Sequence, residues 1–266
     1  MPNLTLNIIS SGQVRVEKIS LLFLETLIEP LRNSNIKINW YGTFWDDELM
    51  VSSKLKLLEE AGCNLELIKP LDPELINEWS TKINPMPNCD LRSNISQYYC
   101  KNASFERANK LIGSTCKTEF YMYFRTDSIF VVPFLRLKGK REYNFKGLQF
   151  YIDQIKDNTE PTLVGLEPID PNRKLPTDQK ILLADDIFGL GNYGGISSFL
   201  TIYKNLVDFA PFSSAEDGKV TKEKIFMPEI ITHNSIVLNK VKYIKIEQSM
   251  PLTIVDGFPL KPWIAK

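Results

Sequence analysis

The sequence predicts an α/β fold, a Rossmann-type three-layer sandwich around a mainly parallel central sheet. Over the first third of the chain, short apolar runs alternate with amphipathic segments at helical spacing, which is typical of βαβ units. A length of 266 residues is enough to bury a sizeable core. No internal repeat, low-complexity tract or clear linker divides the chain, so we expect one domain over residues 1–266.

The first third is expected to hold three strands and two helices. The opening apolar run ends in the polar turn Ser10-Ser11-Gly12, and later apolar positions keep helical spacing until Pro30. A second amphipathic stretch ends at Gly62, a residue favoured just after a helix. The expected order is a strand at 4–9, a helix at 16–31, a strand at 36–41, a helix at 48–61 and a strand at 64–68.

The rest of the chain is less regular. Residues 70–94 are rich in proline and asparagine and are expected to lack regular structure. A helix at 95–112 then precedes an aromatic strand at 119–124. The later expected elements are a short helix or strand at 146–155, a strand at 161–166, a helix at 195–209, a polar segment at 210–221, a helix at 228–238 and a strand at 241–246.

Composition argues against several classes of protein. Lys and Arg together number 32, as do Asp and Glu, and no basic block argues for nucleic-acid binding. Four cysteines without CxxC spacing and a single histidine do not favour a zinc site, so we expect free thiols. The amino terminus lacks a basic n-region, and no run approaches the roughly 20 apolar residues of a membrane span. We expect a cytoplasmic protein with at most peripheral membrane contact.

Arg125 and Asp127 follow the aromatic strand directly and precede a second apolar run at 129–134. Charges are costly inside a buried strand, so both side chains are expected at its carboxyl end, where open α/β sheets bind ligands. One carboxylate can hold a divalent cation and one arginine can bind a phosphate, which are the groups needed for a nucleotide diphosphate. The alternative is a surface Arg–Asp pair at the end of a strand.

Asp185 and Asp186 follow the short apolar run at 181–184. Two carboxylates at such a place either orient sugar hydroxyls or a metal ion, or cap the next turn, and the sequence leaves both interpretations open. Four glycines lie between residues 189 and 195. They indicate either close approach of the backbone to a ligand or a mobile loop.

Glu229 and His233 lie four residues apart in the helix expected at 228–238. In the first helical turn, the helix dipole favours the ionised form of Glu229, which a general base needs. The spacing places His233 on the same helical face. This histidine is then either a ligand or an ordinary structural residue.

Aromatic residues suggest a surface on which sugars stack, since the chain has 15 Phe, 10 Tyr and 4 Trp. Most aromatic side chains in a domain of this size pack in the core. The candidates for an exception lie near one strand end: Trp40, Tyr41, Phe44 and Trp45.

The order of these segments resembles a GT-A glycosyltransferase and is similar, within that fold, to the WavE family of lipopolysaccharide-synthesis proteins. The matching segments are the amino-terminal strand with its polar turn, Ile38 to Asp46, Asn94 to Gln97, Tyr121 to Asp127, Ala184 to Gly191, and Pro228-Glu229. Together they extend over most of the chain. The resemblance implies a nucleotide-binding half of about residues 1–130 and an acceptor-binding half of about residues 131–266.

The resemblance also implies an activity, the transfer of a hexosyl or pentosyl group from a nucleotide-sugar donor to a hydroxyl of a glycan or glycolipid acceptor. Arg125-Thr126-Asp127 stands where such enzymes carry Asp-x-Asp, with Arg125 in place of the first carboxylate. Asp127 is implied to bind a divalent cation, Mn²⁺ or Mg²⁺. The implied roles are donor binding by Ser10, Gly12, Arg107, Arg125, Asp127 and Asp185, catalysis by Glu229 as the base together with Asp186, and metal binding by Asp127 and His233.

Two other functional classes stay open. A nucleotidyltransferase on a similar fold usually carries a glycine-rich loop with a basic residue after its first strand, whereas residues 10–15 read Ser-Ser-Gly-Gln-Val-Arg. A non-catalytic nucleotide- or glycan-binding protein would keep the fold without turnover. Arg125, in place of a metal-binding carboxylate, is the residue that favours this second alternative.

Overall fold

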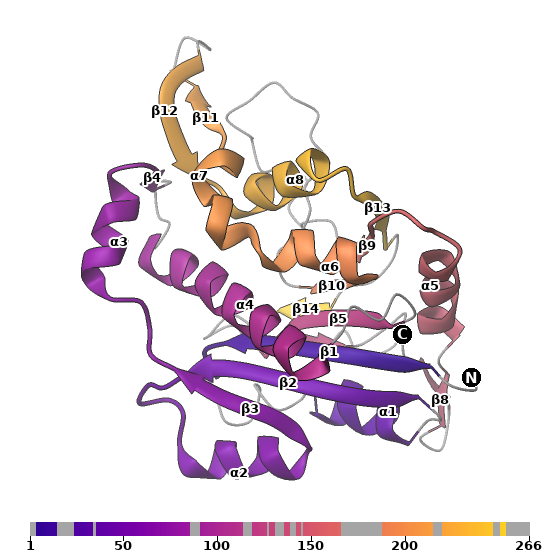
Figure 1. The fold of residues 1–266 in the computed structure, drawn as a ribbon. Helices are drawn as coiled ribbons and strands as arrows, with labels where there is room; N and C mark the ends of the chain where they lie inside the picture. The colour runs from indigo at the N-terminus through magenta and orange to yellow at the C-terminus, as the bar shows by residue number, and fades with distance from the viewer. Residues whose placement is uncertain are drawn as a thin grey trace.

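A central sheet of seven strands organises the chain (Figure 1). The structure is a computed structural model that describes residues 4–14, 24–33, 36–85, 91–113, 119–126, 128–130, 136–138, 142–144, 146–165, 188–214, 220–246 and 251–253. The strands of the sheet are β1 (Thr5–Gly12), β2 (Lys37–Trp45), β3 (Cys63–Ile68), β5 (Phe120–Arg125), β9 (Thr162–Gly165), β10 (Phe188–Gly191) and β13 (Lys242–Lys245).

The sheet has the order β13-β9-β10-β5-β1-β2-β3. β1 pairs in parallel with β2 and β5, and Ile9 lies level with Tyr41 on one side and Tyr123 on the other. β10 is antiparallel to both of its neighbours, while β13 is parallel to β9. Every strand of this sheet except β10 therefore runs in one direction, and the predicted α/β fold with a mainly parallel sheet is confirmed.

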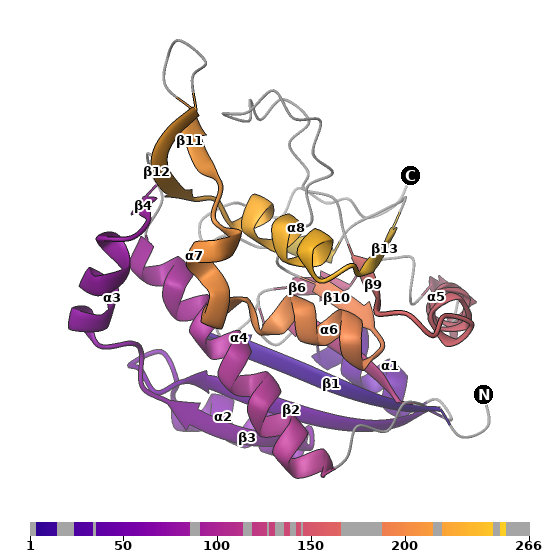
Figure 2. The ribbon, with the colours of Figure 1, turned by 45° about the horizontal axis from the view of Figure 1, so that its top comes forward.

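Helices cover both faces of the sheet (Figures 1 and 2). α1 and α2 lie on one face and α4 and α6 on the other, so the molecule has the three layers that the sequence predicts. The helical elements are a π-helix η1 (Leu24–Ile28), α1 (Glu29–Arg32), α2 (Ser52–Glu60), α3 (Pro73–Ser80), α4 (Leu91–Ile112), α5 (Lys146–Lys156), α6 (Tyr193–Leu200), a 3₁₀ helix η2 (Ile202–Asn205), α7 (Leu206–Phe209) and α8 (Pro228–Leu238).

Within the described residues, short strands make three smaller sheets. One joins β11 and β12 to β4, and its β11–β12 hairpin projects at the top of Figure 1. The short strands are β4 (Asn84–Pro85), β6 (Ser128–Phe130), β7 (Arg136–Lys138), β8 (Glu142–Asn144), β11 (Phe212–Ser214), β12 (Val220–Phe226) and β14 (Pro251–Thr253).

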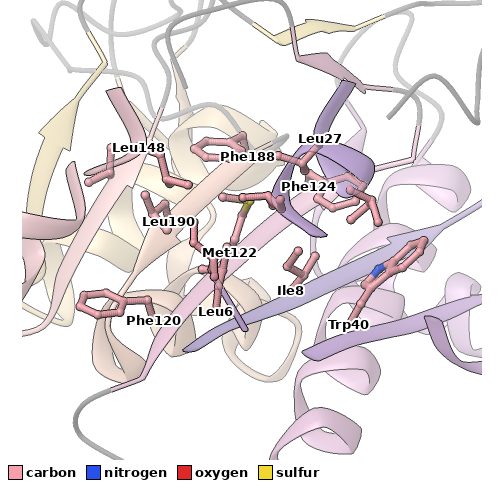
Figure 3. Packing of buried hydrophobic residues seen from close by; sticks show 14 of the residues in the cluster. Leu6, Ile8, Leu27, Trp40, Phe120, Met122, Phe124, Leu148, Phe188 and Leu190 are labelled. Atoms are coloured by element: carbon pink, nitrogen blue, oxygen red, sulfur yellow. The ribbon is translucent and has the colours of Figure 1, made fainter. Parts of the chain in front are cut away.

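The period-two alternation of β1 divides its side chains between two cores. Leu6 and Ile8 point to the face covered by α1 and pack with Met122 of β5 (Figure 3). Ile9 points to the opposite face, in the cluster that contains Phe105 of α4. Each fully buried aliphatic side chain stabilises the fold by about 1.5–3 kcal/mol relative to leaving it exposed.

Two strands extend further than expected. Residues 10–12, predicted as a turn, belong to β1, and β2 continues to Trp45 instead of ending at residue 41. Pairing explains the extension, because Ser11 lies level with Thr43 on one side and Arg125 on the other. A strand inside a sheet keeps its hydrogen bonds for as long as its neighbours continue.

The glycine-rich segment after residue 187 is also regular. It forms β10 and the start of α6, whereas the sequence was also compatible with a mobile loop. A Cβ added at Gly191 would lie 2.4 Å from the carbonyl oxygen of Thr162, and one at Gly195 would lie 2.0 Å from it. The glycines therefore permit close approach of backbone to backbone.

Further differences lie in the region predicted to be irregular and in the second half. α3 lies within residues 70–94, and Asp72 caps it by accepting a 2.8 Å hydrogen bond from the amide of Glu74. The helix expected at 195–209 is divided into α6, η2 and α7, and the polar segment at 210–221 contains β11 and the start of β12. The element at 146–155 is helix α5.

One further expected helix matches the structure, and another lies partly outside the described residues. α8 has the predicted bounds, residues 228–238. The first expected helix is described only from residue 24.

Candidate functional site

A cavity lies where the carboxyl ends of β1, β2 and β5 meet the first turns of α4. Its empty space, counted together with its opening to solvent, is about 330 Å³. Its lining residues are Ser11, Gly12, Gln13, Trp45, Ser93, Gln97, Arg125 and Thr126.

The topology of the sheet explains why the cavity lies at this edge. From β1 the chain passes to β2 by way of α1 on one face, whereas it reaches β5 from β3 by way of α4 on the other face. Connections that leave to opposite faces open a crevice outside the carboxyl ends of β1 and β5. Open α/β sheets bind their ligands at such a switch point.

Gly12 ends β1 with a φ of +110°, a backbone conformation that L residues with a side chain rarely adopt. A Cβ at this position would meet no heavy atom within 4 Å. The backbone at Gly12 is therefore open to the cavity, as expected for a residue that borders a ligand.

The alternation of β1 places Ser11, and not the predicted Ser10, at the cavity. Ser11 lines it, and its hydroxyl lies 3.2 Å from the hydroxyl of Tyr123. Ser10 is fully buried, and its hydroxyl accepts a 2.8 Å hydrogen bond from the indole Nε1 of Trp40. The expectation for Ser10 depended on a turn that does not form, because residues 10–12 continue the strand.

The side of the cavity opposite the sheet comes from α4. Ser93 and Gln97 lie four residues apart in its first turns and both line the cavity. α4 runs 22 residues, and its amino end carries the positive end of the helix dipole. Trp45, at the end of β2, contributes an indole ring. The lining thus combines hydroxyl and amide groups with one aromatic surface.

Arg125 is the charged residue among the described lining residues. It ends β5 and its side chain is half-buried. Thr126 follows it, and the threonine hydroxyl donates a 3.1 Å hydrogen bond to the carbonyl oxygen of Gln13, which ties the end of β5 to the loop after β1. A guanidinium group in a partly desolvated cavity suits a phosphate or carboxylate ligand.

Behind the cavity, Lys54 of α2 is almost fully buried, with 3% of its surface exposed. Its ammonium group donates to the carbonyl oxygen of Val14 at 2.9 Å and to that of Leu49 at 2.7 Å. These two carbonyl groups belong to the loops after β1 and β2. Lys54 therefore fixes the two loops to each other next to the cavity residue Gln13.

The thiol of Cys100 lies directly behind the lining. It is fully buried and donates a 3.2 Å hydrogen bond to the carbonyl oxygen of Thr43. Desolvation raises the pKa of Cys100 to about 12, against the opposing effect of contacts with Gly12, Trp45 and Ser11. A thiol with so high a pKa packs as a small apolar group and is not a nucleophile.

Glu229 and His233 are half-buried in α8, and neither lines the cavity. Tyr98 of α4 connects this helix to the site, because its hydroxyl donates a 3.0 Å hydrogen bond to the carbonyl oxygen of Pro228. Tyr98 follows the cavity residue Gln97 directly. The structure thus brings the first turn of α8 to the helix that forms one wall of the cavity.

Arg107 does not line the cavity. Its guanidinium group donates to the carbonyl oxygens of Gly42 at 3.2 Å and Asn64 at 2.8 Å, and its Nε forms an ion pair with Glu66 at 3.1 Å. α4 places this side chain on the edge formed by β2 and β3, several turns from the cavity end of the helix. Its hydrogen bonds are used in holding the sheet.

Three predicted site residues, Asp127, Asp185 and Asp186, lie outside the described residues. Within the described ranges, no group of three His, Cys, Asp or Glu side chains comes together as a metal site. The described lining of the cavity offers no carboxylate. This set of donors fits an anionic ligand, and it leaves Asp127, directly after Thr126, as the nearest carboxylate in sequence.

The aromatic residues of β2 have different environments. Trp40 and Phe44 are buried in the core, with 3% and 0% of their surfaces exposed. Trp45 lines the cavity. Of the proposed stacking residues, Trp45 is therefore the one with access to a ligand at this site.

Neither a known family model nor a curated protein matches this sequence. Solved structures show distant likenesses. Mouse xyloside xylosyltransferase 1 in its apo form has 9% identity and a TM-score of 0.43, with 92% of this chain and 85% of that chain covered. A 4-diphosphocytidyl-2C-methyl-D-erythritol synthase from Anaerococcus prevotii has 9% identity and a TM-score of 0.40, with 94% and 91% covered.

The glycosyltransferase GlyE of Streptococcus pneumoniae has 17% identity and a TM-score of 0.38, with 92% of this chain and 46% of that chain covered. At these identities and TM-scores, the likenesses do not identify the activity of the chain.

Among the helices that the structure describes, none has both the length and the apolar content needed to cross a bilayer.

Proposed function

We propose that this protein is a glycosyltransferase that moves a sugar from a nucleotide-sugar donor to a hydroxyl of a glycan or glycolipid acceptor. One observation carries the proposal: the cavity at the switch point of the sheet is bordered by the open backbone of Gly12 and by the guanidinium-bearing Arg125. This arrangement suits an anionic nucleotide at the carboxyl ends of parallel strands.

The chemistry follows from the charge that develops during transfer. As the glycosidic bond of the donor breaks, negative charge grows on the leaving nucleoside diphosphate. The guanidinium group of Arg125 stabilises that charge. Glu229 deprotonates the acceptor hydroxyl, Asp186 takes part in catalysis, and Asp185 orients the donor sugar. Oriented binding of both substrates supplies much of the remaining rate enhancement.

A divalent cation, Mn²⁺ or Mg²⁺, is part of the proposal, with Asp127 and His233 as its ligands. When bound, it would neutralise the two phosphates of the donor. The described lining of the cavity supplies a guanidinium group and no carboxylate. No step above is therefore assigned to the metal, and the experiment below measures its contribution.

The proposal includes several finer points. The donor sugar is a hexose or a pentose, and the acceptor belongs to a surface polysaccharide, a lipopolysaccharide or a glycoprotein glycan. We further propose that the protein acts in the cytoplasm and is related to the WavE family. The amino-terminal half, to about residue 130, binds the nucleotide, and the remainder binds the acceptor.

The test uses uridine-, guanosine- and cytidine-linked sugars in a thermal-shift panel, with Mn²⁺ or with EDTA. Binding in large excess over the dissociation constant stabilises the native state by roughly 2–4 kcal/mol. We expect one nucleotide to raise the melting temperature and its sugar conjugate to release nucleoside diphosphate in the presence of acceptor. Failure of every nucleotide to shift the melting temperature would contradict the proposal.

A second outcome separates an enzyme from a non-catalytic binding protein. Arg125, in place of a metal-binding carboxylate, is the residue that favours this alternative. An enzyme should lose release of nucleoside diphosphate on Glu229→Gln while it keeps its donor-induced shift. A binding protein should show the shift without release of nucleoside diphosphate in wild type or variant.

A further inference from the structure

Lys101 is a fully buried lysine in the middle of α4. Its ammonium group lies 5.0 Å from the ring centroid of Tyr98, 5.1 Å from that of Phe199 and 5.2 Å from that of Tyr123. Aromatic faces attract a cation and offset part of the cost of burying it. An apolar side chain of similar length would fill the same space without that cost, so packing alone does not explain the charge.

Two of these rings carry hydroxyl groups that reach different parts of the site. The hydroxyl of Tyr123 lies 3.2 Å from the hydroxyl of the cavity residue Ser11. The hydroxyl of Tyr98 donates to the carbonyl oxygen of Pro228 and lies 3.1 Å from the hydroxyl of Thr232, both in α8. The rings around one ammonium group therefore touch the wall of the cavity on one side and the start of α8 on the other.

We propose that Lys101 is a positioning residue that couples the cavity to the first turn of α8. Its ammonium group attracts the faces of Tyr98 and Tyr123 and so fixes the position of each hydroxyl. Tyr123 then holds Ser11 at the cavity, and Tyr98 holds the turn that carries Glu229. The catalytic meaning of the coupling rests on the proposed function, whereas the coupling itself does not.

Hydrogen exchange measured by mass spectrometry on the full chain tests the coupling without any ligand. Lys101→Met removes the charge and nearly keeps the volume. We expect faster exchange in two separate segments, residues 11–14 and residues 229–232. Tyr123→Phe keeps the ring face and should accelerate only the first segment, while Tyr98→Phe should accelerate only the second.

Tyr203→Phe is the matched control. Tyr203 packs on Trp79 and Tyr99 and is not one of the rings placed around Lys101 above, so the loss of its hydroxyl should change exchange in neither segment. If Lys101→Met accelerates exchange uniformly or only within α4, the lysine is merely structural. If it accelerates one segment alone, the coupling is absent. Either result overturns the proposal. If Lys101→Met fails to fold, the two Tyr→Phe variants still test the hydroxyl links on which the proposal depends, and no change in exchange for either variant overturns it as well.

A functional readout separates binding from turnover. The probes are UDP, GDP and CDP in calorimetry, and hydrolysis of the matching nucleotide sugar in kinetics. We expect Tyr123→Phe to weaken nucleotide binding about tenfold with kcat retained, and Tyr98→Phe to lower kcat about tenfold with KM retained. The same change in both parameters for both variants would contradict separate roles.

Failure of the proposed function and failure of the Lys101 coupling give different results. If wild-type protein binds none of the three nucleotides, the proposed function fails, and the exchange pattern still decides whether Lys101 couples the two segments. If the nucleotides bind and the exchange pattern is absent, the coupling fails alone.

Discussion

The side-chain amide of Gln13 donates a 2.7 Å hydrogen bond to Oδ2 of Asp47, joining the loop after β1 to the loop after β2. The other oxygen of this carboxylate, Oδ1, accepts a 3.0 Å hydrogen bond from the amide of Leu49. Because Gln13 lines the cavity, the shape of the cavity depends on how firmly the two loops are held together. Lys54 holds the same loops through their carbonyl groups.

Lys54→Met should lower the free energy of unfolding by about 1–3 kcal/mol. The carbonyl oxygens of Val14 and Leu49 lose their donors and stay buried, and an unsatisfied buried polar group costs about this much. Urea denaturation measures the change. Lys56→Met is the control: its side chain is 75% exposed and pairs with the likewise exposed Glu60 of the same helix, so it should stay within about 0.5 kcal/mol of wild type. A Lys54→Met protein as stable as wild type would contradict this role of Lys54 in holding the two loops together.

Gly12→Ala should destabilise the protein by about 1–3 kcal/mol through backbone strain alone, since a Cβ there meets no neighbour. Gly113→Ala, at a φ of +73° and equally open, should cost a similar amount at the end of α4. The two variants should differ in nucleotide binding, which only Gly12→Ala weakens. Chemical denaturation and calorimetry measure the two effects. Equal nucleotide affinity in both variants would remove Gly12 from the site.

Arg125→Ala should weaken nucleotide binding by about 10- to 100-fold, because it removes charge-assisted hydrogen bonds to phosphate. Arg107→Ala, a change of the same kind, should lower the free energy of unfolding by about 1–3 kcal/mol, because Arg107 holds the carbonyl groups of β2 and β3. It should leave the nucleotide affinity of the folded protein unchanged. If Arg107→Ala weakens nucleotide binding and Arg125→Ala does not, Arg107 would instead be the donor-binding residue.

The buried thiol of Cys100 predicts a pH-dependent loss of stability. Burial raises its pKa to about 12 in the folded protein, whereas an unfolded chain releases the proton near the ordinary value of 9.0. The stabilisation is complete below the unfolded pKa and is lost as pH rises towards the folded pKa.

Between about pH 8 and about pH 10, wild type should therefore lose about 1 kcal/mol more stability than Cys100→Ala. Cys63, whose pKa is also raised to about 12 by burial, is retained in both proteins, so its contribution cancels. Urea denaturation at the two pH values measures the difference. Parallel losses in the two proteins would show that Cys100 does not titrate in this way.

Local patterns predicted the parts of the fold that depend on neighbours in sequence. α8 has Pro228 in its first turn and an apolar face, and its predicted bounds match the structure. The strand before Arg125 was recognisable from its aromatic run, and Arg125 does lie at the cavity edge that this strand end predicts. In both cases, composition and spacing within about ten residues carry the information.

Features that depend on distant partners were not predictable from the sequence. Ser10 and Ser11 are chemically alike, and the one that reaches the cavity is decided by how far β1 continues between β2 and β5. The sequence does not reveal that the guanidinium group of Arg107 donates to carbonyl oxygens of β2 and β3. The glycines between residues 189 and 195 were compatible with close approach to a ligand or with a mobile loop, whereas at Gly191 and Gly195 it is the backbone of Thr162 that comes close.

The position of β1 between β2 and β5 also affects how the protein folds during synthesis. Leu6 pairs with Ile38 early, but its other partner, Phe120, is made far later. Closing so long a loop is entropically unfavourable, and sheets built from such pairings form slowly. The nascent chain therefore leaves one edge of β1 unpaired until β5 leaves the ribosome, and during that interval this edge is open to pairing with other chains.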